Sequence, residues 1–240
     1  MTYHNKRFAF TLAEVLITIG IIGVVAALTM SSLITGYKRH ELENRFKRTS
    51  ALIETALRNT VNEFSLDDCA YYPANLPCTQ ISSPLRMEMN NYFVSQFKVV
   101  KTAFKEGNAF TDAFSEKLSK IQVKTYDGAI NGKNPVHGIG NSGYELVRKT
   151  YSYILDDGSM ITPIAFQTHG PRDGMKVLFD TNGLSKGPNR MGYDVFIYDS
   201  GYYWANECGT ANGDYGCYKY AQADQNPDDE NKGYWASLEL

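Results

Sequence analysis

The chain opens with a long apolar segment. Residues 10–30 contain a single charged side chain, that of Glu14. About 20 apolar residues, at about 1.5 Å per residue in a helix, are enough to cross the hydrocarbon core of a bilayer. The pattern predicts a helix that is apolar on every side. The Glu14 carboxylate needs a partner of opposite charge, because an ionised group in the hydrocarbon core costs at least about 2.5 kcal/mol.

Apolar residues then continue on one face only. They recur at helical spacing while charged residues fill the other faces, at Leu42, Phe46, Ile53, Leu57, Val61 and Phe64 with a gap across Thr49. We expect one helix from Phe10 to about Glu63. The alternative is two helices with a break near Thr35 and Gly36, since glycine disfavours the helix interior.

The remaining pattern predicts a fold of the α+β class, in which a long helix packs on an antiparallel β-sheet. Two short amphipathic helices are expected first, from Val94, Phe97, Val100 and Phe104 and from Phe110, Phe114, Leu118 and Ile121. Strands are expected from Tyr144 onward, at 151–155, 160–164, 175–179 and 193–198. The first two of these form a hairpin around Asp157-Gly158.

Size and net charge limit the classes of protein to which the chain can belong. With 240 residues, of which 43% are hydrophobic, the chain can form one globular domain after the first helix. The net charge of −2 gives no electrostatic reason to expect nucleic acid as a partner.

The N-terminus resembles that of type IV prepilins and type II secretion pseudopilins. The resemblance rests on the basic leader with Lys6 and Arg7, on Ala9 followed by Phe10, and on Glu14 as the fifth residue counted from Phe10. It implies cleavage between Ala9 and Phe10 and methylation of the new amino terminus at Phe10. It also implies that Glu14 directs assembly by pairing with the amino group of a neighbouring subunit.

Two positions depart from the family pattern. Ala9 stands where the family usually has glycine, and Ser31 stands where many members have proline. We expect cleavage to survive the small Ala9, and nothing forces a kink at Ser31. A secretory signal peptide and the plain signal anchor of a membrane enzyme are the alternatives; the first has a shorter apolar region, and the second does not explain Glu14.

The resemblance implies a division of the chain into four parts. These are a leader at 1–9, a transmembrane and fibre-core half-helix at 10–31, an amphipathic half-helix at 32–64, and a globular head at 65–240 with two cysteine loops.

The function implied is that of a structural subunit of a type IV pilus or a type II secretion pseudopilus. The precursor would lie in the bacterial inner membrane as a single-pass protein, with its head in the periplasm or outside, and would then enter the fibre. Expected partners are a prepilin peptidase, other pilin-like subunits, an assembly ATPase with its inner-membrane platform, and membrane lipid before assembly. A minor pilin, adhesin or DNA-uptake pilin that binds through its C-terminal head is one alternative, and a signal-anchored enzyme is another.

The four cysteines form two pairs with matched spacing, Cys69 with Cys78 and Cys208 with Cys217. A translocated chain meets an oxidising compartment, so we expect disulfides and favour the two local pairings. Zinc is the competing interpretation, but neither pair has Cys-x-x-Cys spacing and no histidine lies nearby.

The segment between the last two expected strands is rich in Asp, Asn and Gly. Asp180, Asn182 and Asp194 carry the hard oxygen ligands that Ca²⁺ requires, and similar segments occur in many pilin-like proteins. The alternative is an Asx-turn loop in which these side chains cap their own backbone. Calcium is the one cofactor that the sequence raises.

Residues that would indicate catalysis are sparse. The sequence has four histidines and lacks the nucleophile-elbow, zincin, Walker A and dinucleotide motifs. We therefore expect no enzyme activity.

Overall fold

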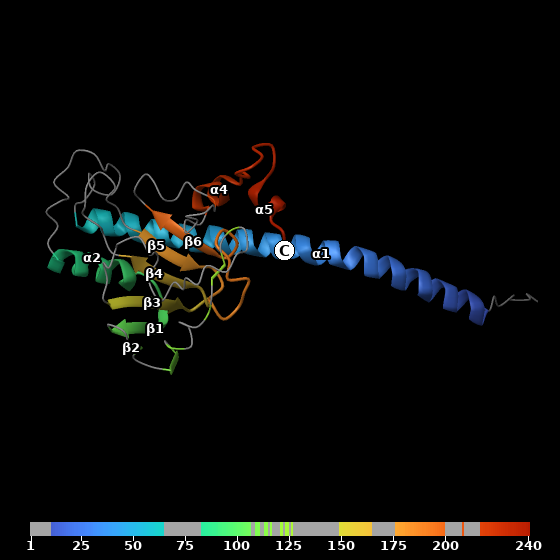
Figure 1. Cartoon of the computed structure of the whole chain (residues 1–240), viewed down its shortest axis with the longest axis horizontal. Helices are drawn as coiled ribbons and strands as arrows, with labels where there is room; N and C mark the ends of the chain where they lie inside the picture. Colours follow the sequence, from blue (N-terminus) through green and yellow to red (C-terminus); the bar gives the residue numbers. More distant parts are fainter. Residues whose placement is uncertain are drawn as a thin grey trace, which may run out of the picture.

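The computed structural model describes residues 11–64, 83–106, 109–110, 113–114, 116, 121, 123–124, 126, 149–164, 176–199, 208 and 217–240. In chain order its elements are α1 (Leu12–Glu63), α2 (Ser83–Ser95), β1 (Val99–Glu106), β2 (Ala109–Phe110), β3 (Lys149–Leu155), β4 (Met160–Ile164), β5 (Lys176–Asp180), β6 (Val195–Asp199), α4 (Tyr218–Ala223) and α5 (Tyr234–Ser237). Helix α1 projects far beyond a head that holds every other element (Figure 1). Ala9, Phe10, Cys69 and Cys78 lie outside the described residues.

Helix α1 is continuous over 52 residues, which at about 1.5 Å each gives a rod of about 78 Å. It begins at Leu12, two residues later than the sequence predicts, because Thr11 is extended and serves as the N-cap. It passes through Ser31 and Gly36 without a break, and the Thr35 hydroxyl donates to the Ser31 carbonyl at 3.0 Å. The prediction of one helix is confirmed and the two-helix alternative is wrong.

The second half of α1 buries the predicted stripe. Leu42, Phe46, Ile53, Leu57 and Val61 are all 7% exposed or less. At Thr49, where the apolar pattern of the sequence is interrupted, the buried face continues, because Thr49 and Ser50 are buried as well. The Ser50 hydroxyl donates to the Lys47 carbonyl within the same helix. The buried face is therefore continuous, with small polar residues at its centre.

The described strands form one antiparallel sheet in the order β2-β1-β3-β4-β5-β6, which lies against α1 (Figure 1). The predicted hairpin joins β3 to β4, with Tyr153 opposite Ile161 and with Gly158 at a positive φ of 87° in the turn. Strands β5 and β6 match the last two predicted strands to within two residues at either end. The α+β prediction is confirmed.

The prediction of a helix through Val94, Phe97, Val100 and Phe104 is wrong for its second half. Helix α2 ends at Ser95, and Val100 and Phe104 lie in β1. The run Val99-Val100-Lys101-Thr102 is rich in β-branched residues, which favour strands, and β1 pairs with β3 along most of its length. Apolar residues four apart lie on one face of a strand as well as of a helix, so spacing alone was ambiguous. Phe110, placed in the second expected helix, lies in β2.

Strands β5 and β6 bury side chains on both faces of the sheet. Val177, Phe179 and Phe196 join the core formed with α1. Their neighbours in the strands point the opposite way, as the two-residue period of a strand requires, and form a second cluster, which includes Leu178, Val195 and Ile197. The loop between β5 and β6 thus connects two strands whose side chains are buried on both faces of the sheet.

Phe46 is the centre of the main core. It is 1% exposed, and its ring centroid lies 4.6 Å from that of Phe196 and 5.3 Å from that of Trp235. Tyr218 of α4 is 5.4 Å away by the same measure. One helical residue therefore contacts the sheet and the C-terminal helices together.

The C-terminal segment is held on α1 by hydrogen bonds. The Tyr218 hydroxyl donates to Glu54 Oε1 at 2.6 Å. The guanidinium of Arg39 donates twice to the Leu238 carbonyl, at 2.9 and 2.7 Å. The C-terminus consequently lies beside α1 where the helix leaves the head (Figure 1).

We predict that Phe46→Ala destabilises the head by about 3 to 5 kcal/mol, because it removes a large side chain from a closely packed aromatic cluster. The matched control is Leu52→Ala, at a position on the same helix that is 43% exposed, with an expected loss of about 0.5 kcal/mol or less. Denaturant unfolding of the full-length protein in detergent measures both. Equal losses in the two variants would show that Phe46 does not hold the core together.

Candidate functional site

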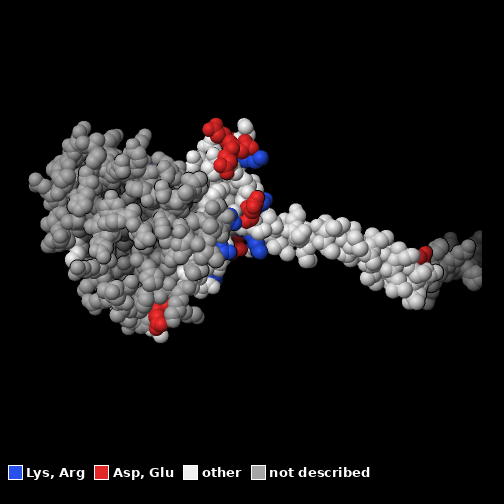
Figure 2. Space-filling view, viewed as in Figure 1, with Lys and Arg blue, Asp and Glu red and all other residues white. Residues whose placement is uncertain are grey.

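The first half of α1 projects beyond the head and is exposed along its length (Figure 1). Every described residue from Thr11 to Ile34 is exposed, and the exposed fractions of Leu16, Ile22 and Leu33 are 63%, 66% and 72%. Figure 2 shows this half as a bare rod of uncharged residues with one acidic side chain near its start. So large an apolar surface is unstable in water. It must be covered by lipid or by other protein.

Glu14, the single acid of that half, lies in the first turn of the helix. Its Oε2 accepts from the Thr11 backbone N–H at 2.8 Å and from the Thr11 hydroxyl at 2.9 Å. The Glu14 N–H in turn donates to the Thr11 hydroxyl at 3.2 Å. This capping box satisfies backbone donors that a helix start leaves open. Both groups that bind the carboxylate are neutral, so its charge has no cation among these contacts.

Helix α1 is long and apolar enough to cross a membrane. The most apolar stretch of the helix, 18 residues long, is not buried against the described part of the chain. Burial on α1 begins only at Leu42. The helix thus has one half that is suited to a bilayer and one half that packs within the head.

A second candidate site is the loop between β5 and β6. Asp180 and Asp194, at its two ends, are both fully buried. Asp180 Oδ1 accepts from the backbone N–H groups of Asn182 and Gly183, at 2.9 and 2.7 Å. Asp194 accepts from the N–H groups of Asn189 and Arg190, each at 2.8 Å. The two carboxylates therefore hold the loop by its backbone.

Two glycines allow the loop to pack this closely. Gly183 has a φ of 81°, and a Cβ there would lie 2.4 Å from the Gly158 carbonyl oxygen in the β3–β4 turn. Gly192 has a φ of 77°, and a Cβ there would lie 2.7 Å from both the Tyr126 ring and the Tyr234 hydroxyl. Glycine alone fits both the conformation and the space.

The buried carboxylates resist ionisation. Burial raises the pKa of Asp180 well above its usual value, and the negative charge of Asp194 adds to this effect. Burial also raises the pKa of Asp194, to about 6, against hydrogen bonds from the loop that lower it. Two carboxylates close together in an apolar site favour sharing a proton or binding a cation.

In the part of the chain that the structure describes, several oxygens of this loop are buried without a hydrogen-bond partner. They are Asp180 Oδ2, Thr181 Oγ1, Asn182 Oδ1 and Asn189 Oδ1. The Asn182 side chain faces Asp194, since its Nδ2 lies 3.3 Å from Asp194 Oδ2. Carboxylate and amide oxygens of this kind are the ligands of Ca²⁺, so the loop fits the predicted ion. Among the described residues, no three His, Cys, Asp or Glu side chains form a metal-binding group, so amide oxygens would have to complete the site.

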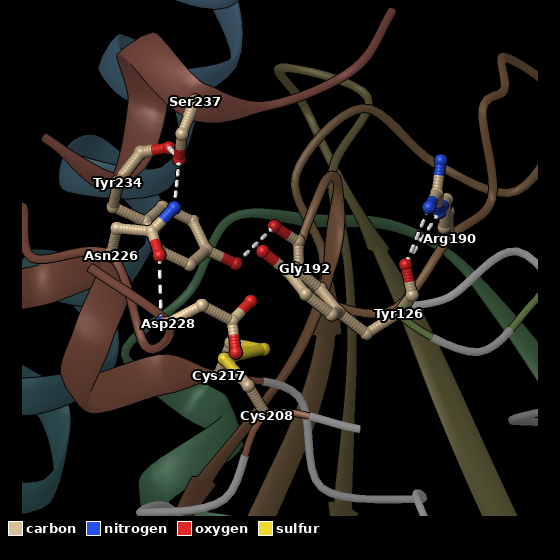
Figure 3. The surroundings of a disulfide bond; sticks show 9 residues. All are labelled: Tyr126, Arg190, Gly192, Cys208, Cys217, Asn226, Asp228, Tyr234 and Ser237. Atoms are coloured by element: carbon tan, nitrogen blue, oxygen red, sulfur yellow. Dashed lines mark hydrogen bonds between the residues drawn. A yellow bond between two sulfur atoms is a disulfide. The ribbon is translucent and has the colours of Figure 1, made fainter. Parts of the chain in front are cut away.

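The disulfide between Cys208 and Cys217 lies beside the far end of this loop (Figure 3). It is the local pairing expected for these two cysteines. Cys217 is fully buried, and its Sγ would lie 3.1 Å from a Cβ at Gly192. The Tyr234 hydroxyl donates to the Gly192 carbonyl at 2.5 Å, and the Arg190 guanidinium donates to the Tyr126 carbonyl. The disulfide and α5 therefore hold the segment that leads into Asp194.

Sequence reasoning missed several residues of this arrangement. Tyr234 and Trp235 are fully buried or nearly so, although they follow a polar stretch near the C-terminus. Asn226, within that stretch, is 9% exposed, and its side-chain oxygen accepts from the N–H groups of Asp228 and Asp229. The adjacent aromatic residues Tyr234 and Trp235 were the one feature of the sequence that could have indicated a buried C-terminal segment.

We predict that the calcium-free protein is less stable at pH 7.5 than at pH 5. The folded chain holds protons on Asp180 and Asp194 that the unfolded chain, with Asp pKa values near about 3.9, has already released, so stability falls as pH rises through about 6. A shift of about two units on one carboxyl corresponds to about 3 kcal/mol.

Thermal unfolding in chelator, measured on the full-length protein in detergent, tests this. Asp180→Asn removes one of the two buried carboxyls that titrate and should reduce the pH dependence. Asp156→Asn is the matched control, since Asp156 is an exposed residue of the β3–β4 turn, and should leave the dependence unchanged. A wild-type stability that rises over the same range would contradict the prediction.

Comparison with known proteins places a family motif on the N-terminal segment. Residues 4–30 match the prokaryotic N-terminal methylation motif. No curated protein and no solved structure matches the chain. The match covers residues 4–9 of the leader, Phe10, Glu14 and most of the exposed half of α1. It points to a pilin-like structural protein that a prepilin peptidase processes and that assembles with other such subunits. Residues 4–30 are thus the signal motif of type IV pilin and pseudopilin precursors.

Proposed function

We propose that this chain is a structural subunit of a type IV pilus or a type II secretion pseudopilus. The precursor is cleaved between Ala9 and Phe10, methylated at Phe10 and assembled into a helical fibre. The observation that carries the proposal is a methylation motif on a half-helix whose apolar side chains are exposed in the described part of the chain. The protein acts through packing and not through catalysis.

The precursor stage requires a bilayer. A run from Leu12 to Ile34, at about 1.5 Å per residue, spans about 34 Å and matches the hydrocarbon core. The motif and the helix together fit anchoring in the inner membrane. We propose that the head then lies in the periplasm or outside, and that an assembly ATPase with its membrane platform moves the subunit into the fibre.

In the fibre, Glu14 sets the register of each new subunit. Cleavage creates an α-amino group at Phe10, which is the cation that the Glu14 carboxylate lacks in the single chain. When the carboxylate of an incoming subunit meets that amino group on a neighbour, both buried charges are paired. Every other axial position leaves a charge unpaired in an apolar core, which is strongly unfavourable.

We predict that Glu14→Ala lowers incorporation into fibres by about a hundredfold or more, since removing one partner of a buried ion pair costs about 3 to 5 kcal/mol. Thr18→Ala is the matched control: Thr18 lies one turn further along the same apolar half, and its hydroxyl donates to the Val15 carbonyl of its own helix. The measurement is the fraction of subunit recovered in sheared or induced fibres relative to the membrane. Normal incorporation of Glu14→Ala would contradict the register mechanism.

We also propose a structural Ca²⁺ ion in the β5–β6 loop. Asp180, Asn182 and Asp194 would hold it, and the buried, unpartnered oxygens of Asp180 and Asn182 support the assignment. The ion would neutralise two buried carboxylates and so stabilise the loop at neutral pH. Its role is in the fold of the head and not in a reaction.

We predict that Ca²⁺ raises the stability of the full-length protein at pH 7.5 by about 2 to 3 kcal/mol when its concentration is about a hundredfold above Kd. Mg²⁺ should have a smaller effect, because it requires a tighter octahedral site and loses its water reluctantly. Thermal unfolding with Ca²⁺, with Mg²⁺ and with chelator measures this, and Asp180→Asn should remove the response. Identical melting with Ca²⁺ and with chelator would exclude the site.

A further inference from the structure

A polar pocket lies beside α1 in the part of the helix that packs within the head. It has a volume of about 400 Å³ and is lined by α1, the β3–β4 turn and the β5–β6 loop, with Arg48 and Asp157 among its residues. Lys186 borders the same turn, because its Nζ would lie 3.8 Å from a Cβ at Gly158. Two long cationic side chains therefore stand next to one polar pocket.

Arg48 has no close partner in the described part of the chain. Its Nε lies 3.6 Å from Asp157 Oδ2, beyond hydrogen-bond distance, and its side chain is 64% exposed. The other oxygen of that carboxylate accepts from the N–H and the hydroxyl of Ser159, at 2.9 and 2.6 Å. By contrast, Arg45 is held by two hydrogen bonds to Glu41. Arg48 is thus the arginine of the pocket that is available to a further carboxylate.

The loop between α4 and α5 carries the opposite charge, and we call it the acidic loop (residues 224–232). It contains four carboxylates and one lysine. That lysine, Lys232, pairs with Asp229 at 2.9 Å. Asp228 and Glu230 are exposed and have no ion pair in the described part of the chain. The acidic loop thus presents two carboxylates that a cation of another molecule can reach.

The pocket and the acidic loop lie on opposite flanks of α1. Arg45, which lines the pocket, and Lys47 lie about 100° to either side of Phe46, the centre of the buried face. Glu54, on the Lys47 side, accepts from Gln222 of α4 at 2.8 Å. Figure 1 shows α4 and α5 on one side of α1, and β3 and β4 on the other. Parallel copies can therefore join pocket to loop in a heterologous contact, which is the kind that builds a helical fibre.

Hydrogen bonds of the C-terminal segment place the acidic loop near the level of Arg39. The Asn226 side chain donates to the Ser237 hydroxyl at 2.6 Å, and the next residue, Leu238, accepts from Arg39. Arg48 lies nine residues further along α1, or about 14 Å. The loop and Arg48 are therefore far apart within one chain, and also between two copies at the same height.

The offset between subunits shortens this distance. When Glu14 of an incoming subunit pairs with the amino group at Phe10 of its neighbour, the incoming chain is displaced by four residues, or about 6 Å, toward its N-terminal end. Arg48 of the incoming subunit is then level with residue 44 of the neighbour. About 8 Å remain to the level of the neighbour's Arg39, which extended arginine and glutamate side chains can cover together.

We propose that the acidic loop of each subunit in the fibre enters the pocket of the subunit added after it. There the two exposed carboxylates of the loop pair with Arg48 and Lys186. The inference rests on the proposed function, because it takes the parallel packing and the offset from the Glu14 pair. The Glu14 pair sets the height of a subunit, and the contact between heads sets which flank faces the neighbour. Each exposed ion pair is weak and is screened by salt, but the contact is repeated at every subunit.

The test is charge exchange in the full-length subunit, with the fraction recovered in sheared or induced fibres as the measurement. Arg48→Glu and Glu230→Arg should each lower that fraction about three- to tenfold, because an exposed ion pair becomes a repulsion. The double variant restores a pair of opposite charges and should recover the fraction to within about twofold of the wild type. Because the two positions are far apart within one chain, this rescue can arise only between subunits.

The matched control is Arg58→Glu, which makes the same change of charge at an exposed residue of α1 ten residues beyond Arg48. It should leave incorporation unchanged.

Crosslinking of the wild-type protein gives a second measurement that does not depend on the variants. A carbodiimide joins an amine directly to a carboxylate that contacts it. Mass spectrometry should find Lys186 joined to Asp228 or Glu230 in fibres, and should not find this link in the monomer in detergent.

Three results would overturn the inference and leave the proposed function intact. They are normal incorporation of both single variants, a double variant that is no better than the single variants, and fibres without the Lys186 link. A wild-type chain that enters no fibre would overturn the inference and the proposed function together.

Discussion

Helix α1 buries apolar side chains in the head along its second half only, and its first half is left to be covered by a membrane or by other subunits. The rest of the structure depends on this division. From Leu42 onward the helix buries a continuous face against the sheet and the C-terminal helices, with Phe46 at the centre. From Thr11 to Ile34 every side chain is exposed in the described part of the chain. Because one rigid rod joins the two halves, the position of the membrane or fibre half determines where the head stands.

The head is built to hold that rod firmly. The aromatic contacts of Phe46 tie the helix to β5, β6, α4 and α5. The bond from Tyr218 to Glu54 and the clamp of Arg39 on Leu238 add polar contacts along the same side. The loop from Asp180 to Asp194 closes the sheet next to α1, and the disulfide Cys208–Cys217 supports its far end. A force on the helix is thereby transmitted to the whole head.

The sequence predicted those features that a repeating pattern encodes. The long helix followed from the apolar stripe through Leu42, Phe46 and Ile53, and the hairpin followed from alternation around Asp157-Gly158. Val100 and Phe104 were misassigned, because residues four apart share a face in both helices and strands and only pairing with β3 decides between them. The burial of Thr49, Thr181 and Trp235 could not be predicted, since each depends on contacts between segments far apart in the chain. For the same reason the convergence of Asp180, Asn182 and Asp194 was only a hypothesis at the level of the sequence.

The most direct test of the account is the mass of the N-terminal peptide of the protein recovered from its native membrane. We expect a chain that begins at Phe10 and carries one added methyl group, since only that cleavage creates the amino group that pairs with Glu14. A chain that still begins at Met1, or one cut within the apolar segment near Ala26 and Ala27, would lack that amino group beside Glu14 and would contradict the proposed assembly.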